Sequence, residues 1–291
     1  MNAFSHSSET SSNLHPYAKL LSEAEAACRL AGSIQSQAYG KPIDYSTKST
    51  PVDLVTEVDR ACDEAIRNHL SQAFPEHLLL TEETYVDGTP VDLSNTWVVD
   101  PLDGTTNFTH GFPFFAVSIA YVRNGSPEVG VVYDVTRDEC FSAIRGQGAW
   151  LNGRPIQISA TASLSQCLLA TGFPYDHRIR PEDNIPFFLA FMSRCHGVRR
   201  AGSAALDLCY VACGRLDGFW ELRLGPWDVA AGALIVEEAG GKVTTLTGDT
   251  VDYSQRKISI LGANPATGVL DEMLSVCRDT PTHKSDSVYT G

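Results

Sequence analysis

The sequence predicts an α+β fold in which two packed subdomains each contain a sheet covered by helices. Strand-like segments separated by short turns follow one another in residues 114–144, as expected for an antiparallel-sheet half. From residue 167 onward, segments with strand and helix periodicity alternate, which is typical of a mixed α/β half. The expected subdomains are residues 15–158 and residues 159–278.

Two amphipathic helices are expected before the antiparallel sheet. Apolar residues recur at helical spacing in residues 17–34. A second helix should follow Thr56, with an apolar face that runs from Val58 to Leu70. The segment TEVD, residues 56–59, has the form of a capping box, which is the structural interpretation of Asp59.

The antiparallel half is expected to be a meander. Strands at residues 114–122 and 129–135 flank the turn NGSP at residues 124–127. A third strand at residues 140–144 leads toward the turn at Asn152-Gly153.

The second half and the chain ends complete the expected organisation. The periodicity predicts strands near residues 167–171, 219–222, 242–245 and 258–262, and helices near residues 181–194, 203–213, 228–239 and 268–277. Residues 1–14 and 279–291 have little apolar content and are expected to be disordered tails.

Charge and composition argue against several classes of function. The chain of 291 residues has a net charge of −13, which is unsuited to a general nucleic-acid or anionic-membrane surface. No apolar run approaches the roughly 18 residues of a membrane span. Residues 1–14 lack the features of a signal peptide, so a cytoplasmic location is expected. Eight dispersed cysteines form no C-x-x-C pair, which indicates neither a zinc site nor a disulfide framework.

The most informative segment is DPLDGTTNF, residues 100–108, where a strand should end and a helix begin. Pro101 biases Asp100 away from the helical region, so Asp100 is expected to close the strand and Asp103 to lie in the turn. Two carboxylates at this spacing suit a divalent cation beside a phosphate, and the amides of residues 104–106 are candidate phosphate donors. The structural alternative is that Asp103 caps a helix and Asp100 merely ends a strand.

Two further acidic features lie at the ends of predicted elements. Glu82 and Glu83 follow an apolar run, and neighbouring carboxylates there repel each other unless a cation lies between them. The alternative for this pair is a solvated acidic turn. Asp228 begins a helix, where it is also an ordinary N-cap. The hard oxygen ligands that these segments offer favour Mg²⁺ or Mn²⁺ over zinc, and they come from Glu82, Asp100, Asp103 and Asp228.

These segments resemble the paired signature of the inositol monophosphatases, Mg²⁺-dependent and lithium-sensitive members of the fructose-1,6-bisphosphatase superfamily. The resemblance rests on residues 100–108 together with WDVAAG at residues 227–232, and KSTPVDLVT at residues 48–56 strengthens it. It extends from about residue 15 to residue 277 in matching order and spacing. It implies a layered αβαβα sandwich, the sugar-phosphatase fold, and a homodimer.

The resemblance also implies roles for individual residues. Two or three Mg²⁺ ions, or Mn²⁺ in their place, would be held by Glu82, Asp100, the backbone carbonyl of Leu102, Asp103 and Asp228. Thr105 and Asp59 would orient and deprotonate the attacking water, and Glu82 would help with a third, weaker ion. The phosphate and the rest of the substrate would contact Gly104, Thr105, Gly202, Ser203, Ala204 and Glu221. One departure is that Thr81 stands where the family usually has Gly, which should keep the ligand in place but alter the loop.

The expected function is Mg²⁺-dependent hydrolysis of a phosphate monoester, myo-inositol 1-phosphate, by an activated water. Fructose 1,6-bisphosphate, 3′-phosphoadenosine 5′-phosphate and histidinol phosphate stay open as substrates of related phosphatases. The continuation Thr106-Asn107-Phe108 resembles the inositol branch more than the nucleotide and histidinol branches, which typically continue with Thr-Lys. The other alternative is a non-catalytic regulatory protein with the same fold. The expected partners are a small phosphorylated polyol and a second copy of the chain, without nucleic acid or membrane.

Overall fold

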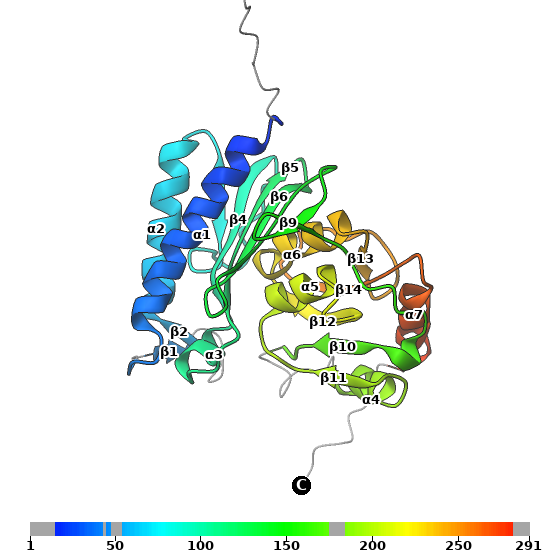
Figure 1. Ribbon diagram of the computed structural model, residues 1–291. Helices are drawn as coiled ribbons and strands as arrows, with labels where there is room; N and C mark the ends of the chain where they lie inside the picture. Colours follow the sequence, from blue (N-terminus) through cyan, green and yellow to red (C-terminus); the bar gives the residue numbers. More distant parts are fainter. Residues whose placement is uncertain (1–14, 43–44, 48–53, 175–183, 282–291) are drawn as a thin grey trace, which may run out of the picture.

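The computed structural model describes residues 15–42, 45–47, 54–174 and 184–281. Helices and sheets alternate in five layers, with helices on both outer sides and between the two sheets (Figure 1). The predicted α+β sandwich is therefore confirmed.

Some predicted features lie outside the described residues. They are the tails, except for residues 279–281, the first six residues of the segment KSTPVDLVT, and the first three residues of the helix expected at 181–194.

The first sheet has seven strands in the order β3-β4-β5-β6-β7-β8-β9. Neighbouring strands are antiparallel except β3 and β4, which run parallel. The strands are β3 (Leu78–Thr81), β4 (Asn95–Asp103), β5 (Ala116–Arg123), β6 (Ser126–Asp134), β7 (Glu139–Ile144), β8 (Ala149–Leu151) and β9 (Arg154–Ile156). Helices α1 (Ala18–Ala38) and α2 (Glu57–Ala73) cover its outer face with their apolar sides.

Turn and cap residues fix the ends of these elements, although β6 begins at Ser126, three residues earlier than predicted. Asn124 and Gly125 have φ values of 50° and 78°, the left-handed values that a tight hairpin between β5 and β6 requires. The Thr56 side chain accepts hydrogen bonds from the amides of Val58 and Asp59, and the Asp59 carboxylate accepts one from the Thr56 amide. The predicted capping box is therefore confirmed.

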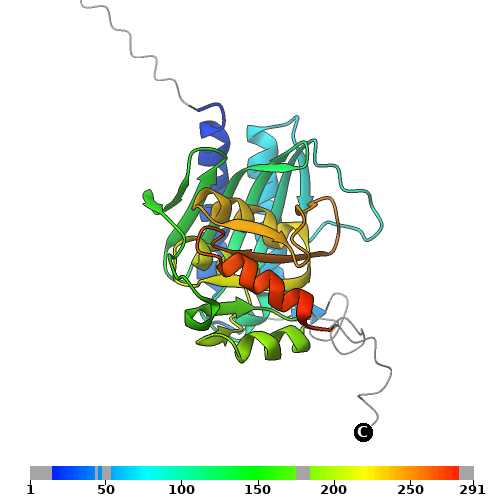
Figure 2. The same ribbon diagram turned by 90° about the vertical axis from the view of Figure 1, so that its right-hand side faces the viewer.

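The second sheet has five strands in the order β11-β10-β12-β14-β13. It is mixed, because β10 runs parallel to β11 and β12, whereas β14 is antiparallel to β12 and β13. The strands are β10 (Leu168–Thr171), β11 (Gly197–Arg199), β12 (Gly218–Leu224), β13 (Lys242–Thr245) and β14 (Ile258–Ala263). Helices α4 (Ile185–Met192) and α7 (Val269–Asp279) lie on its outer side, which Figure 2 shows with α7 in red.

Smaller elements complete the chain. They are the antiparallel pair β1 (Tyr45–Thr47) and β2 (Leu54–Thr56), the five-residue helix α3 (Thr105–Thr109) and the 3₁₀ helix η1 (Leu164–Gln166). All eight cysteines are free thiols. In the described part of the chain, no helix is both long and apolar enough to cross a membrane.

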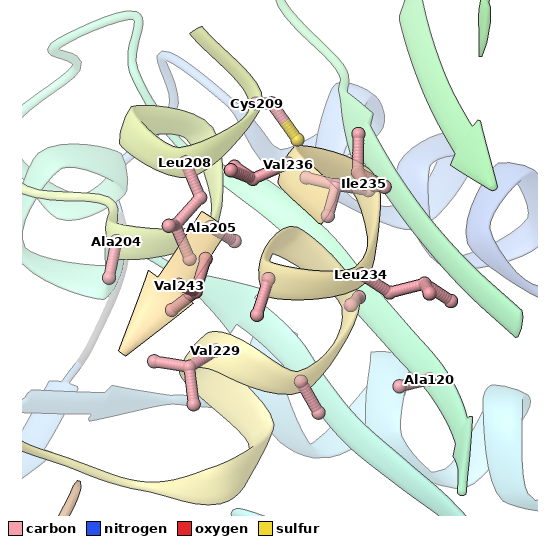
Figure 3. Close-up of a cluster of buried hydrophobic side chains, with 14 of the residues drawn as sticks. Ala120, Ala204, Ala205, Leu208, Cys209, Val229, Leu234, Ile235, Val236 and Val243 are labelled. Atoms are coloured by element: carbon pink, nitrogen blue, oxygen red, sulfur yellow. The ribbon is translucent and has the colours of Figure 1, made fainter. Parts of the chain in front are cut away.

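The middle layer consists of α5 (Ala204–Ala212) and α6 (Pro226–Glu238). From Pro226 to Val236, every residue of α6 except Asp228 is buried. Figure 3 shows side chains of α5 and α6 gathered with Val243 of β13 and Ala120 of β5, so this core joins the two sheets. A helix that is apolar on all sides is stable only when it is buried, and the fold therefore fixes α6 in place.

Substituting Gly130 tests how closely α6 approaches the first sheet. A Cβ atom on Gly130 of β6 would lie 2.8 Å from the carbonyl oxygen of Ala231 in α6. Both positions belong to the backbone of buried elements, so Gly130→Ala should lower the free energy of unfolding by about 1–3 kcal/mol. Urea unfolding measures the change. The control is Gly262→Ala, whose Cβ would lie 3.4 Å from a Val243 methyl group. Equal losses in the two variants would contradict the close approach.

Candidate active site

A cavity of about 390 Å³ lies where elements of both halves meet. Its wall includes the ends of β3 and β4, the turn after β10, strand β12 and the start of α6. Most of the site residues predicted from the sequence line it, namely Glu82, Asp100, Leu102, Asp103, Gly104, Thr105, Gly202, Ala204, Glu221 and Asp228. Asp59 and Ser203 lie behind this wall, in contact with residues that form it.

Three carboxylates converge at one point of the cavity. Ligand oxygens of Glu82, Asp100 and Asp228 all lie within 4.8 Å of one another. Glu82 follows β3 and its amide donates to the Val99 carbonyl at 3.1 Å. Because β3 and β4 are parallel, their carboxyl ends meet at the same edge of the sheet, and Glu82 comes to lie near Asp100.

Asp228 reaches the cluster from the middle layer. Helix α6 begins at Pro226, two residues earlier than predicted, so Asp228 occupies its third position and is not the N-cap itself. Its Oδ2 accepts a hydrogen bond from the Gly225 amide at 2.6 Å. A carboxylate in the first turn also interacts favourably with the helix dipole, which holds Asp228 at this end of α6.

The sequence predicted that strand β4 ends at Asp100, but the strand continues to Asp103. Its pairing with β5 shifts register between these two residues. Pro101 has no N–H to donate to a ladder, which explains an irregularity at this position. The Leu102 amide turns instead to Asp100 Oδ1, at 2.9 Å. The backbone thus leaves regular pairing where both carboxylates enter the cavity.

The second carboxylate of this segment is fixed from the other half of the molecule. Asp103 Oδ2 accepts hydrogen bonds from Ser203 Oγ at 2.6 Å and from the Ala205 amide at 2.8 Å. Ser203 is also the N-cap of α5, where it accepts from the Leu206 amide. Ser203 therefore holds Asp103 rather than lining the cavity.

The electrostatics of the cluster fit a divalent cation. Burial raises the pKa of Asp103 to about 6, and the neighbouring Glu82 carboxylate adds to the increase. Burial raises the pKa of Asp228 well above its usual value, with Glu82 and Asp103 adding to it. Buried carboxylates that repel one another are stabilised when a cation lies between them. The cluster of Glu82, Asp100 and Asp228 offers only oxygen ligands, which suit a hard cation such as Mg²⁺ or Mn²⁺.

A hydroxyl–carboxylate pair lies next to the cluster. Thr105 Oγ1 is 2.9 Å from Asp59 Oδ1 and 3.1 Å from the Leu102 carbonyl oxygen. The other oxygen of Asp59, Oδ2, is held by the capping box at Thr56. Asp59 thus serves as a capping residue with one oxygen and as the partner of Thr105 with the other. Its pKa is raised by burial, although hydrogen bonds from Thr56 and Thr105 partly offset this effect.

Gly104 allows the chain to turn between Asp103 and Thr105. Its φ is +99°, and a Cβ there would lie 3.0 Å from the Phe114 carbonyl oxygen. Only glycine meets both conditions without strain.

The wall opposite the carboxylate cluster includes Glu221 of β12. Burial raises the pKa of Glu221 to about 8, with Asp228 and Asp103 adding to the increase and Arg200 opposing it. A Cβ on Gly172 would lie 2.0 Å from Glu221 Oε1, so glycine at that position leaves the space that the carboxylate occupies.

Thr81, the departure from the family pattern, is buried at the end of β3. Its hydroxyl lies 2.7 Å from Thr84 Oγ1 and also accepts a hydrogen bond from the Thr84 amide at 3.3 Å. These contacts fix the turn that carries Glu82.

Sequence reasoning missed the basic side chains that line the cavity and one buried carboxyl near them. The basic residues that line the cavity are Arg200, Arg223, Arg256 and Lys257. No sequence pattern indicated these basic residues, because loops that are distant in sequence come together only in the folded chain. Asp207 of α5 is 1% exposed, and its Oδ1 has no hydrogen-bond partner among the described residues. Burial raises its pKa, with Glu221 and Asp103 adding to the increase. An Asp inside an apolar helix was the available signal, since unpaired carboxyls are rarely buried.

One of these basic residues joins the elements that carry Glu82 and Asp228. The Arg256 Cζ lies 4.7 Å from the Trp227 ring centroid and 5.3 Å from that of Tyr85. The Arg256 Nε also lies 3.3 Å from Asp87 Oδ1. Because Asp87 is exposed, this ion pair contributes little to stability. The stacking on two rings is the more substantial contact, and it links the loop after β3 to the start of α6.

The chain is similar to known proteins over most of its length. The model of the inositol monophosphatase family matches residues 17–279. An inositol-1-monophosphatase from Synechocystis is 44% identical over 247 residues, which cover 85% of each chain. The Nus factor SuhB of Escherichia coli is 45% identical over 269 residues, covering 91% of this chain and 97% of that one. Among solved structures, an inositol monophosphatase from Anabaena superposes with a TM-score of 0.81 at 39% identity, covering 92% of this chain and 98% of that one.

Proposed function

Because the chain belongs to the inositol monophosphatase family, a family of phosphatases, we propose that it hydrolyses a phosphate monoester in a Mg²⁺-dependent reaction. The proposed substrate is myo-inositol 1-phosphate, and the products are myo-inositol and phosphate. The observation that carries the proposal is the convergence of Glu82, Asp100 and Asp228 within 4.8 Å, in a cavity that Thr105 also lines.

The metal ligands of the proposal are Glu82, Asp100, the carbonyl of Leu102, Asp103 and Asp228. The convergence of Glu82, Asp100 and Asp228 and the mutual repulsion of these carboxylates support this assignment. When bound, two divalent cations neutralise phosphoryl oxygens and lower the pKa of the attacking water. Glu82 would also help to hold a third, weaker ion, and Mn²⁺ is the alternative to Mg²⁺.

Thr105 and Asp59 would handle the proton of the attacking water. A hydroxyl donates one hydrogen bond and accepts others. When Thr105 Oγ1 donates to Asp59 Oδ1, its lone pairs accept a hydrogen bond from the water. As the water attacks phosphorus, its proton passes to Thr105 Oγ1 while the hydroxyl proton passes to Asp59 Oδ1. The raised pKa of Asp59 makes this carboxylate a better base than an exposed one.

The remaining predicted residues would position the substrate. The amides of Gly104 and Thr105 would donate to the phosphate oxygens. Gly202 and Ala204 would form the wall against the polyol, and Ser203 would act by holding Asp103. Glu221 would accept hydrogen bonds from hydroxyl groups of the polyol.

Phosphate release from a panel of esters, with and without Mg²⁺, tests the proposal. The panel contains myo-inositol 1-phosphate and the alternative substrates fructose 1,6-bisphosphate, 3′-phosphoadenosine 5′-phosphate and histidinol phosphate. Release that does not depend on a divalent cation would contradict the metal assignment. The homodimer and the cytoplasmic location stay predictions from the sequence.

The other candidate function is that of a non-catalytic regulatory protein. The specific observation in its favour is the 45% identity with a protein named as a Nus factor. Such a role would use the outer surface of the fold and not the cavity. A folded chain that releases no phosphate from any ester of the panel would favour this role alone.

Substituting Asp228 tests its role as a metal ligand. Asp228→Asn should nearly abolish turnover and weaken Mg²⁺ binding, because the amide loses the charge but keeps an acceptor for the Gly225 amide. Phosphate release and Mg²⁺ titration calorimetry measure the two effects. The control is Asp271→Asn, which alters the same helix position in α7 at an exposed site. Retained Mg²⁺-dependent turnover in folded Asp228→Asn would exclude this ligand.

Substituting Thr105 tests its role in proton transfer. Thr105→Ala should lower kcat by about 10²–10⁴ with a smaller effect on KM, because the variant loses a positioned acid–base group. Steady-state kinetics measure both constants. Thr109→Ala removes a hydroxyl from the same short helix and should keep kcat, since that hydroxyl bonds to the Thr106 carbonyl and to no other described residue. A near wild-type kcat in Thr105→Ala would show that this hydroxyl does not handle the proton.

Substituting Glu221 tests whether this residue recognises the polyol of the substrate. Above pH 8, where Glu221 is ionised, Glu221→Gln should lower kcat/KM for myo-inositol 1-phosphate by about tenfold, because a neutral acceptor replaces a charged one. The loss for 4-nitrophenyl phosphate, which has no polyol, should be much smaller. An equal loss on both substrates would mean that Glu221 supports the carboxylate cluster or the fold instead.

A further inference from the structure

Gln35 is a polar side chain in the buried, otherwise apolar face of helix α1, and it is 0% exposed. Its position continues the helical spacing of Ala24, Cys28 and Ala31, where an apolar residue is expected. Its Oε1 has no hydrogen-bond partner among the described residues. Burying an amide that is only partly hydrogen-bonded costs free energy, which a leucine at this position would avoid. The other end of the amide must therefore make a contact that gives the residue its purpose.

That contact is with the irregular part of strand β4. The Nε2 of Gln35 donates a hydrogen bond to the carbonyl oxygen of Pro101 at 2.8 Å, although the two residues are 66 positions apart. Pro101 lies where the pairing of β4 with β5 shifts register, between Asp100 and Asp103. A carbonyl oxygen can only accept, so the amide turns its NH₂ group to β4 and leaves Oε1 in the apolar core.

The peptide group that Gln35 holds also orients a carboxylate of the cavity. The Pro101 carbonyl and the Leu102 N–H belong to one planar peptide group. Gln35 donates to its oxygen, and its N–H donates to Asp100 Oδ1 at 2.9 Å. A peptide group that accepts a hydrogen bond at its oxygen is polarised, so its N–H donates more strongly. Two consecutive hydrogen bonds thus connect α1 to Asp100, a member of the carboxylate cluster.

A second contact fixes the end of α1 against the same segment of the chain. Tyr39 follows Gln35 by one helical turn, and its amide donates to the Gln35 carbonyl at 2.8 Å. Its hydroxyl donates to the Gly111 carbonyl at 2.7 Å, and its ring lies 6.0 Å from that of Phe108 and 5.0 Å from that of Phe115. The helix end therefore cannot shift freely relative to β4, and Gln35 is held at a fixed distance from Pro101.

We propose that Gln35 is a positioning residue that orients the Asp100 carboxylate for the divalent cation, through the peptide group between Pro101 and Leu102. This inference rests on the proposed metal-dependent function. The cavity wall, as far as the structure describes it, does not include Gln35, so the residue acts on metal binding and not on the substrate. Residues that support metal ligands from behind contribute to metal affinity in this way.

Replacing the amide of Gln35 with an apolar side chain of similar length tests the proposal. Gln35→Met should raise the dissociation constant of Mg²⁺, measured by titration calorimetry, by about 3–10-fold, because Asp100 loses its support. At saturating Mg²⁺, KM for the ester that the protein hydrolyses best should change by less than about twofold. Gln37→Met makes the same substitution on the exposed face of α1 and should leave the dissociation constant unchanged.

Two further variants separate metal binding from stability. Leu20→Ala removes apolar contacts from the buried face of α1, so it should lower the unfolding temperature of the Mg²⁺-free protein and keep the dissociation constant. Gln35→Leu repeats the test with a residue that suits this apolar face and is expected to fold. Unchanged Mg²⁺ affinity in either folded Gln35 variant, or an equal loss in Leu20→Ala, would overturn the role of Gln35. A wild-type protein that binds no Mg²⁺ would instead overturn the proposed function.

Discussion

Repulsion among the carboxylates of the cavity is the constraint on which the rest of the structure depends. Asp103 and Asp228 have raised pKa values because the surrounding protein desolvates them and because neighbouring carboxylates add to the cost of their ionisation. Such groups stay together only where a rigid scaffold holds them. The parallel pairing of β3 with β4 brings Glu82 to Asp100, and the buried helix α6 carries Asp228 to the same point.

Hydrogen bonds orient three of these carboxylates and offset part of this cost. Asp100 accepts from the Leu102 amide, Asp103 from Ser203 and Ala205, and Asp228 from the Gly225 amide. In each case a donor of the protein engages one carboxylate oxygen, which fixes the direction of the group. Asp59 follows the same arrangement, since Thr56 holds one oxygen and Thr105 contacts the other. The site is therefore pre-organised by the same bonds that cap helices and close turns.

The two halves of the molecule contribute different parts of the cavity. The first sheet supplies Glu82, Asp100 and Asp103, whereas β12 in the second sheet supplies Glu221 and Arg223. Contacts across the halves keep these parts in register, including the Asn107 amide group, which donates to the carbonyl of Ala201 at 2.8 Å.

The sequence by itself determined the elements and most of the candidate site. Hydrophobic periodicity located the main helices and strands, because burial of one face imposes a period on the chain. The segment at residues 100–108 and Asp228 indicated a carboxylate cluster, because hard oxygen donors near small residues carry a chemical signal of their own. Only the tertiary structure decided that β4 continues to Asp103, that Ser203 holds Asp103, and that Arg200, Arg223 and Arg256 line the cavity. These features depend on contacts between segments far apart in sequence, and no local pattern encodes which loops will meet or which residue in a strand will occupy a bulge.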